Sequence, residues 1–240
     1  MNTANTTLFI SDLHLSPQEP RITNTFLHFL KIATSADAVY ILGDLFEAYV
    51  GDDDDSGFMK QVTEAVTQFT KNGPPTFFMR GNRDLLVGKK WMQRSGMQLL
   101  EDPTVINLYQ QKIILAHGDA LCTDDTAHQR YRYWMQQPWV QKILLSLPLS
   151  LRRWIANRMR QKSQTHYSEQ DLKKWDVVDN AVLALFKKYN VQTLIHGHTH
   201  KPAIHSYENA KRIVLDTWHQ HGSYLEISRD GAMQTKFLEH

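Results

Sequence analysis

Cysteine is almost absent from this 240-residue sequence, in which Cys122 is the single example. An intramolecular disulfide and a cysteine-based zinc cluster are therefore both excluded. Long apolar runs are missing as well. The longest notable uncharged stretch, 143–151, is far shorter than the roughly 20 residues that a membrane-spanning helix needs. Residues 1–7 contain neither the basic nor the apolar region of a signal peptide. We therefore expect a soluble protein, or one that rests on a membrane surface.

Neither sign of charge is in large excess. The chain has 27 Lys and Arg against 25 Asp and Glu, which gives a formal net charge of +2. This balance argues against a general nucleic-acid binder, so we expect no nucleic-acid partner. A content of 42% hydrophobic and 22% charged residues indicates a globular protein rather than a disordered one. The length suits one large domain, or one domain with an insertion.

Acidic residues are missing from one long segment, 126–168, which contains eight Lys and Arg and no Asp or Glu. Three of the six tryptophans, Trp134, Trp139 and Trp154, lie in this segment. Its pattern predicts helices that are broken at Pro138 and Pro148. We interpret 123–175 as a helical cap that is inserted into a core formed by 1–122 and 176–240.

Short, continuous apolar runs recur along the rest of the chain, at 8–10, 39–42, 76–79, 113–116 and 193–195. Such runs are typical of strands that are buried on both faces. Amphipathic helical patterns lie between them, at 58–69 and 178–186. Alternation of strands and helices predicts an α/β fold with a largely parallel centre. After residue 200, short strands at 212–218, 224–227 and 233–238 predict an antiparallel extension.

Each apolar run ends in polar residues that can bind a metal. These residues are Asp12, His14, Asp44, Asn82, His117, His198 and His200. The carboxyl ends of strands are the edge at which open α/β sheets bind ligands. The donors are oxygen and imidazole without thiolate, which suits Mn, Fe, Co or Zn better than Mg or Ca. Within the pairs Asp12/His14 and His198/His200 the residues are two apart, so on an extended segment both would point to one face.

The ordered motifs Asp12-x-His14, Gly43-Asp44, Gly81-Asn82, His117 and Gly197-His198-x-His200 resemble those of the calcineurin-like metallophosphoesterase superfamily. The resemblance implies a four-layer α/β/β/α sandwich with two metals that activate a water for attack on phosphorus. It also implies that Asp44 bridges the metals. One metal would be held by Asp12, His14 and His200, and the other by Asn82, His117 and His198.

Arg83 departs from the superfamily, in much of which a histidine follows the Gly-Asn pair. Arginine cannot protonate a leaving alkoxide near neutral pH. A leaving phosphate needs no such acid, because its pKa is about 6, and Arg83 can neutralise it with a bidentate contact. This residue therefore favours a pyrophosphate substrate over a simple monoester.

Longer stretches, at 9–15, 40–47, 51–54, 81–84, 117–119, 121–125 and 194–200, resemble the UDP-2,3-diacylglucosamine pyrophosphatases of the lipid A pathway. That resemblance implies hydrolysis of UDP-2,3-diacylglucosamine to UMP and 2,3-diacylglucosamine 1-phosphate. It also implies two Mn²⁺ ions and a peripheral, cytoplasmic place on the inner membrane. The substrate contacts that it implies are Asn82, Arg83, Asp125, Ser163 and His198, and Asn82 and Arg83 are also the predicted catalytic residues. Tyr167 and Gln170 stand where the family has Asn and Lys, so these two contacts are not carried over.

The basic segment contains one helical stripe that suits such a substrate. The apolar face of this stripe consists of Leu151, Trp154, Ile155 and Met159, and Arg158 and Lys162 continue the same face as cations. The face would hold acyl chains and phosphate and would lie on an anionic membrane, although an ordinary packed helix gives the same pattern. We expect no obligate protein partner.

Three other functions stay open at this point. They are another metallophosphoesterase activity, such as nucleotide pyrophosphatase or cyclic-nucleotide phosphodiesterase, a non-enzymatic scaffold, and a nuclease. Among the remaining polar residues, we predict a solvated loop at 52–55. His196 is expected beside the metal ligands. His28, His205, His219 and His221 are expected at the surface or in packing.

Overall fold

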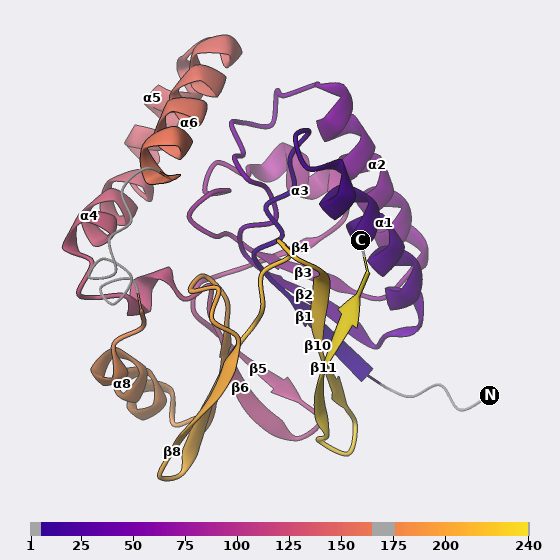
Figure 1. Cartoon of the computed structure of the whole chain (residues 1–240), viewed down its shortest axis with the longest axis vertical. Helices are drawn as coiled ribbons and strands as arrows, with labels where there is room; N and C mark the ends of the chain where they lie inside the picture. The colour runs from indigo at the N-terminus through magenta and orange to yellow at the C-terminus, as the bar shows by residue number, and fades with distance from the viewer. Residues whose placement is uncertain (1–5, 165–175, 240) are drawn as a thin grey trace.

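The computed structural model describes residues 6–164 and 176–239, without the side chains of 162–164, and contains two β-sheets (Figure 1). The first sheet has the strand order β11-β10-β1-β2-β3-β4, and the second has the order β5-β6-β7-β9-β8. The first consists of β1 (Thr6–Ile10), β2 (Ala38–Leu42), β3 (Thr76–Met79), β4 (Gln98–Leu100), β10 (Gly222–Ser228) and β11 (Met233–Leu238). The second consists of β5 (Thr104–Leu108), β6 (Gln111–Leu115), β7 (Thr193–His196), β8 (Ala203–Tyr207) and β9 (Ala210–Val214).

The strands of both sheets are parallel at the centre. Strands β1 to β4 pair in parallel, and so do β6, β7 and β9. Antiparallel strands lie at the edges, where β10 pairs with β1 and β11, β5 with β6, and β8 with β9. The predicted α/β fold with a parallel centre is confirmed.

Seven α-helices join the strands among the described residues, besides two short 3₁₀ helices at Ala33–Ser35 and Asp119–Leu121. The α-helices are α1 (Pro20–Ile32), α2 (Gly57–Asn72), α3 (Lys89–Ser95), α4 (Thr126–Met135), α5 (Pro138–Ser146), α6 (Leu149–Gln164) and α8 (Asp179–Tyr189). The predicted helices at 58–69 and 178–186 are confirmed as α2 and α8. Helix α2 begins after Ser56, whose side chain accepts a hydrogen bond from Met59 N, and it ends at Gly73.

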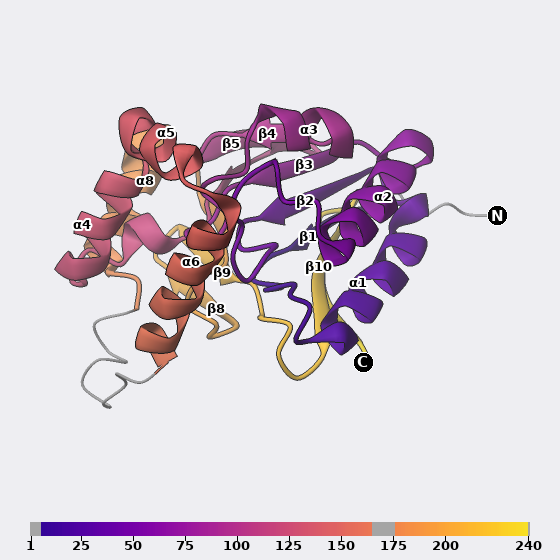
Figure 2. The same ribbon diagram turned by 90° about the horizontal axis from the view of Figure 1, so that it is seen from above.

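Four layers explain why the apolar runs are continuous. In β1, Leu8 and Ile10 pack toward α1 and α2, whereas Phe9 packs toward the second sheet. In β6, Ile113 and Leu115 share that inter-sheet core, and Ile114 packs toward α8. Successive side chains thus enter different cores. The order of layers is helices, first sheet, second sheet and helix, which confirms the predicted α/β/β/α sandwich (Figure 2).

The region after residue 200 differs from the prediction in two respects. The expected strand at 212–218 is β9, which ends at Val214, and β8 precedes it without having been predicted. The chain then crosses to the first sheet, and Trp218 is fully buried against Phe26 and Phe29 of α1. The predicted strands at 224–227 and 233–238 are confirmed as the hairpin β10–β11.

Helices α4, α5 and α6 form what we call the three-helix segment. Pro138 is the first residue of α5, and Pro148 directly precedes α6, so both predicted breaks are confirmed. The segment lies to one side of the sheets, away from α1 and α2 (Figure 1). Among the described residues, no helix is long and apolar enough to span a bilayer.

Trp91 provides a test of the core between α3 and the first sheet. Its ring is fully buried against Phe46 and Phe78, and Nε1 donates to Thr63 at 3.0 Å. We expect Trp91→Ala to lower the free energy of unfolding by about 3–5 kcal/mol. Trp139→Ala, which removes a tryptophan that is 56% exposed, should change it by about 0.5 kcal/mol or less. Urea denaturation measures both, and equal effects would contradict this account of the core.

Candidate metal centre

The predicted ligands all follow strands whose carboxyl ends meet between the two sheets. Asp12 and His14 follow β1, Asp44 follows β2, and Asn82 follows β3. From the second sheet, His117 follows β6, while His198 and His200 follow β7. Asp12, Asp44 and His117 are fully or almost fully buried. The structure brings the seven residues together as the sequence predicts, although their metal roles remain a prediction.

The backbone at the ligands is not extended. Asp12, His14, Asp44, His198 and His200 all have positive φ, between 51° and 69°. The expectation that each pair shares one face of an extended segment is therefore wrong. A left-handed conformation costs a non-glycine residue roughly 1–3 kcal/mol, and such residues cluster at functional sites. Because of these turns, His198 and His200 belong to two different groups of converging donor atoms.

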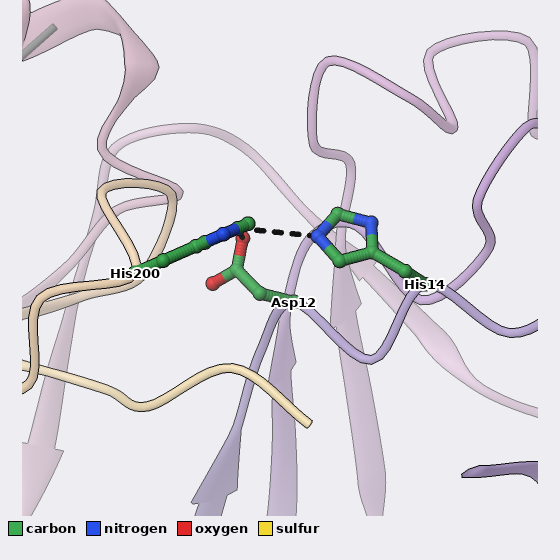
Figure 3. Close-up of side chains that lie close together, drawn as sticks. All are labelled: Asp12, His14 and His200. Atoms are coloured by element: carbon green, nitrogen blue, oxygen red, sulfur yellow. Dashed lines mark hydrogen bonds and ion pairs between the residues drawn. The ribbon is translucent and has the colours of Figure 1, made fainter. Parts of the chain in front are cut away.

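The first group consists of Asp12, His14 and His200, whose donor atoms all lie within 4.8 Å of one another. Figure 3 shows the two imidazoles pointing toward each other beside the carboxylate. The Nε2 atoms of His14 and His200 are 3.2 Å apart, and Asp12 Oδ1 lies 3.4 Å from His200 Nε2. The other carboxylate oxygen of Asp12 accepts a hydrogen bond from His198 N at 2.8 Å. Convergent nitrogen and oxygen donors of this kind fit a divalent transition metal.

The second group consists of Asp44, His117 and His198, again with donor atoms within 4.8 Å of one another. His117 Nδ1 lies 2.9 Å from Leu42 O, and a carbonyl can only accept, so Nδ1 carries the hydrogen. In the neutral ring, Nε2 then presents a lone pair to Asn82 Oδ1, which is 3.0 Å away. With no metal bound, a proton on Nε2 satisfies both atoms, and a bound metal ion would take the place of that proton. The group therefore fits a metal that Asn82 also binds.

The charges of the two groups also favour cations. Burial alone would lower the pKa of His117, but the carboxylates of Asp44, Asp119 and Asp12 outweigh it and raise that pKa to about 10. The surroundings of His117 are thus strongly negative. Burial lowers the pKa of His198 to about 3, so this imidazole is neutral and keeps a lone pair.

Asp84 holds two of the ligand loops together. Its carboxylate accepts hydrogen bonds from Gly81 N at 2.6 Å and from Leu45 N at 2.8 Å. The two nitrogens belong to the residues beside Asn82 and Asp44. Burial and the neighbouring Asp44 raise the pKa of Asp84 to about 7. The sequence motif contains Asp84, but nothing in the spacing revealed this bridging role.

Glu47 is a functional candidate that the sequence pattern did not reveal. Its Oε1 lies 2.6 Å from Arg83 Nη1 and 2.8 Å from Arg160 Nε, and its Oε2 lies 3.4 Å from His14 Nδ1. Glu47 therefore contacts a candidate metal ligand, the predicted catalytic arginine and α6 at once. Arg83 Nε is also 3.7 Å from Asp44 Oδ2.

Three further histidines lie beside the ligands. His128 of α4 was not predicted, and its ring centre is 5.3 Å from that of His198. His219 was expected at the surface or in packing, but its exposed side chain stacks on His14 with ring centres 5.7 Å apart. His196 lies beside the ligands as expected and belongs to neither group. Only proximity in the fold identifies His128 and His219, because they follow no apolar run.

The loop at 52–55 was predicted to be solvated, and Asp53 and Asp55 are exposed as expected, whereas Asp52 and Asp54 are partly buried. Asp52 accepts hydrogen bonds from the backbone nitrogens at the start of α3. Asp53 pairs with Arg152, and Asp54 pairs with Arg153 at 2.6 Å. The acidic loop therefore joins the basic helix α6 to the core.

A cavity of about 330 Å³ lies between the ligand loops and the three-helix segment. Asn82, Arg83, His128 and Arg160 are among its polar lining residues. Its apolar lining includes Tyr131, Met135 and Leu144 of α4 and α5, Ile155 and Met159 of α6, and Leu85 and Leu86 of the core. An apolar pocket with a few convergent polar groups is typical of a ligand site.

The predicted stripe on α6 divides between two surfaces. Ile155 and Met159 line the cavity, but Trp154 is 57% exposed and carries Arg158 over its ring at 5.5 Å. The cation that reaches the site is therefore Arg160, not Arg158. The side chain of Lys162 lies outside the described residues.

The two remaining predicted substrate contacts have different outcomes. Asp125 is at the N-terminus of α4, where its side chain accepts a hydrogen bond from His128 N at 2.9 Å. Its contact with substrate stays a prediction. The side chain of Ser163 is outside the described residues, as are Tyr167 and Gln170.

The family model of the calcineurin-like phosphoesterases matches residues 6–202, which include all seven candidate ligands. The chain belongs to the calcineurin-like phosphoesterase family.

Its similarity to curated proteins is more specific. A UDP-2,3-diacylglucosamine hydrolase of Coxiella burnetii (strain RSA 331 / Henzerling II) is 49% identical over 233 residues, which cover 95% of this chain and 96% of that protein. A protein of the same name from Yersinia pestis bv. Antiqua (strain Angola) is 48% identical over 229 residues, with coverage of 93% and 95%. The resemblance inferred from the sequence is thus confirmed. A solved archaeal phosphodiesterase, at 12% identity and a TM-score of 0.51, covers 97% of this chain and 99% of its own and shares the fold.

Gly81 offers a test of the metal centre. A Cβ at this position would overlap the carboxylate of Asp44 and would lie 2.5 Å from its backbone nitrogen. We expect Gly81→Ala to weaken Mn²⁺ binding by at least about tenfold, because it displaces Asp44, and outer contacts to metal ligands are typically worth 10–100-fold in affinity. Calorimetric titration of the metal-stripped protein measures the affinity. Gly57→Ala is the matched control, since a Cβ there meets nothing within 4 Å. Equal affinities in the two variants would contradict the proposed place of Asp44.

Proposed function

We propose that this protein hydrolyses the pyrophosphate bond of UDP-2,3-diacylglucosamine to give UMP and 2,3-diacylglucosamine 1-phosphate. The observation that carries the proposal is the cavity, because it joins the candidate ligand Asn82 and the neighbouring Arg83 to an apolar wall on α4, α5 and α6. A substrate with a pyrophosphate and two acyl chains needs both surfaces in one site. The names of the relatives at 48–49% identity support the same substrate.

We propose two Mn²⁺ ions at the two groups. Asp12, His14 and His200 would hold one ion, Asn82, His117 and His198 the other, and Asp44 would bridge them. When bound, such a pair polarises the phosphoryl oxygens and lowers the pKa of a shared water. The bridging residue has to be a carboxylate, because one side chain must neutralise two dications. Asn82 can be neutral, since its ligand atom is the amide oxygen.

Arg83 would act on the leaving phosphate. Its guanidinium lines the cavity and now lies against Glu47 Oε1, so an incoming phosphate can replace that carboxylate. The fixed charge neutralises the phosphate as the bond to phosphorus breaks. Asn82 and His198 would contact the phosphoryl group, since both lie beside the predicted metals.

The rest of the substrate would lie along the three-helix segment. Arg160 presents a second cation to the cavity beside Glu47. Ile155 and Met159 offer an apolar wall to the acyl chains, each buried methylene of which is worth roughly 0.8 kcal/mol. We also propose Asp125 and Ser163 as substrate contacts. We further propose that 123–175 is a cap inserted into a core of 1–122 and 176–240.

A membrane surface is the place where such a substrate is found, and we propose that the protein binds the cytoplasmic face of the inner membrane peripherally. Tyr133, Trp134, Trp139 and Trp154 of the three-helix segment are all exposed. Arg158 lies over the ring of Trp154. Exposed aromatic side chains interleaved with cations suit an anionic lipid interface.

Replacement of Arg83 tests its catalytic role. We expect Arg83→Ala to lower kcat on UDP-2,3-diacylglucosamine by about 10²–10³-fold, the usual loss for one electrostatic donor in the transition state. Steady-state kinetics on Mn²⁺-loaded protein measures it. Arg21→Ala removes an exposed arginine on α1 and should leave kcat unchanged. A wild-type kcat in Arg83→Ala would exclude a catalytic role for this residue.

Two neighbouring residues of α6 allow the cavity and the exposed surface to be tested separately, because Ile155 lines the cavity and Trp154 does not. We expect Ile155→Asp to reduce the ratio of kcat/KM between acylated and deacylated substrate in detergent by about tenfold or more, because it places a charge on the apolar wall. Trp154→Asp should leave this ratio unchanged, since Trp154 is outside the cavity. It should instead weaken binding to vesicles that contain anionic phospholipid.

Measurements of kcat/KM on the wild-type protein distinguish the proposed function from its alternative. Equal kcat/KM on acylated and deacylated substrate would overturn the lipid substrate and would favour a nucleotide pyrophosphatase. Unchanged vesicle binding in Trp154→Asp would overturn the membrane surface alone.

A further inference from the structure

Arg212 of β9 is a buried arginine that the proposed reaction does not use. It is 4% exposed and lies behind the metal centre, on the strand next to β7. Its Nη1 is 3.3 Å from His196 Nε2, and its Nε donates to the hydroxyl of Tyr207 at 3.3 Å. That hydroxyl in turn donates to Asp179 Oδ1 at 2.7 Å. The guanidinium is thus held between a histidine on one side and a tyrosine on the other.

The contact with Arg212 determines which nitrogen of His196 carries hydrogen. A guanidinium has only donors, so His196 Nε2 must be the acceptor. In a neutral ring the hydrogen is then on Nδ1, which lies 2.8 Å from Gly197 O. The other tautomer would place two donors opposite each other at Nε2 and two acceptors opposite each other at Nδ1. Arg212 and the Gly197 carbonyl therefore both select the Nδ1–H form.

The Gly197 carbonyl that His196 contacts belongs to the turn that separates His198 from His200. It also accepts a hydrogen bond from Thr199 N at 2.8 Å, and Gly197 N donates to His117 O at 2.9 Å. Gly197 therefore links two ligand loops through the two peptide units that flank it. Its geometry must be maintained, because His198 and His200 both have positive φ, at 69° and 54°.

The ring of His196 also touches the loop of His117 directly. A Cβ on Gly118 would lie 2.7 Å from His196 Nδ1, so the ring is in close contact with the backbone that follows His117. His196 is fully buried and has no freedom to turn away from either loop. One imidazole thus contacts both loops that supply the histidines of the second group.

We propose that Arg212 is a positioning residue for the metal centre. It holds His196 as the Nδ1–H tautomer, and His196 then holds the Gly197 peptide that directs His198 into one group and His200 into the other. Metal binding in this proposal depends on the ligand roles proposed above for His198 and His200. The tautomer itself does not, because the contacts that select it involve no metal.

The tautomer is measurable by NMR. In protein with ¹⁵N-labelled histidine and diamagnetic Zn²⁺, the ring-nitrogen spectrum of His196 should identify Nδ1 as the protonated nitrogen. We expect Arg212→Met to lose this single tautomer and to weaken Mn²⁺ binding by about 10–100-fold, the usual effect of an outer contact on metal affinity. An unchanged tautomer or an unchanged affinity in Arg212→Met would overturn the proposal.

Two variants distinguish positioning from a general loss of stability. Arg152→Met removes another buried arginine, which lies on α6, is 5% exposed and pairs with Asp53 of the core. This variant should leave the His196 tautomer and the Mn²⁺ affinity unchanged. His196→Asn keeps an amide donor near the position of Nδ1 and has no Nε2. In that background, Arg212→Met should cause no further loss of affinity. Additive losses in the double variant would contradict action through His196.

If Arg212→Met folds poorly, Tyr207→Phe provides the test instead. Tyr207→Phe removes only the hydroxyl that accepts a hydrogen bond from Arg212 Nε and leaves Arg212 in place. We expect a partial loss of the Nδ1–H tautomer there, and a wild-type spectrum would overturn the proposal. Failure of the wild-type protein to bind Mn²⁺ would instead contradict the proposed function. The spectrum of metal-stripped protein would then still test the tautomer.

Discussion

A cluster of buried acceptors between the two sheets is the constraint on which the rest of this structure depends. Asp12 and Asp44 are almost completely buried, and the imidazoles of the candidate ligands surround them. Burial of two carboxylates is unfavourable unless positive charge balances them. The features around the cluster keep it in place for that charge. Asp84 joins two ligand loops, and His196 joins two others.

The three-helix segment depends on the core for its charge balance. It contains no acidic residue in the part that begins at Thr126, and the acids that neutralise it belong to the core. Asp53 and Asp54 pair with Arg152 and Arg153 at the beginning of α6. The remaining acids are Asp102 and Asp119, both paired with Arg132 of α4, and Glu47, paired with Arg160. The cavity is formed where these two complementary surfaces meet.

The positions of the ligands could be predicted from sequence because apolar runs mark buried strands and the polar residue after each run marks its carboxyl end. The layers follow from the same runs, as Phe9 and Ile10 enter different cores. The local geometry could not be predicted in this way. Asp12 and His14 are two apart, as in an extended strand, but their positive φ depends on tertiary contacts such as the bond from Asp12 N to Gly43 O.

Residues whose role depends on contacts distant in sequence were also missed. His128 and His219 follow no strand, and only the folding of α4 and of the chain after β9 brings them to the ligands. On α6, periodicity grouped Trp154 with Ile155, because adjacent residues fall within one broad helical face. The docking of the helix through Asp53 and Asp54 then separated them, with one exposed and one in the cavity.

Glu47 gives the resting site an internal substitute for the substrate's phosphate. Its carboxylate already satisfies Arg83 and Arg160, so an anion gains only the difference between its own contacts and those it displaces. Weak anions such as chloride gain little from that exchange, whereas a phosphoryl group with several oxygens can satisfy both arginines at once. The exchange would also transfer Arg160 from Glu47 to the ligand, while Arg152 remains paired with Asp53 near the other end of α6. The ligand would thus replace one of the ion pairs that join this helix to the core.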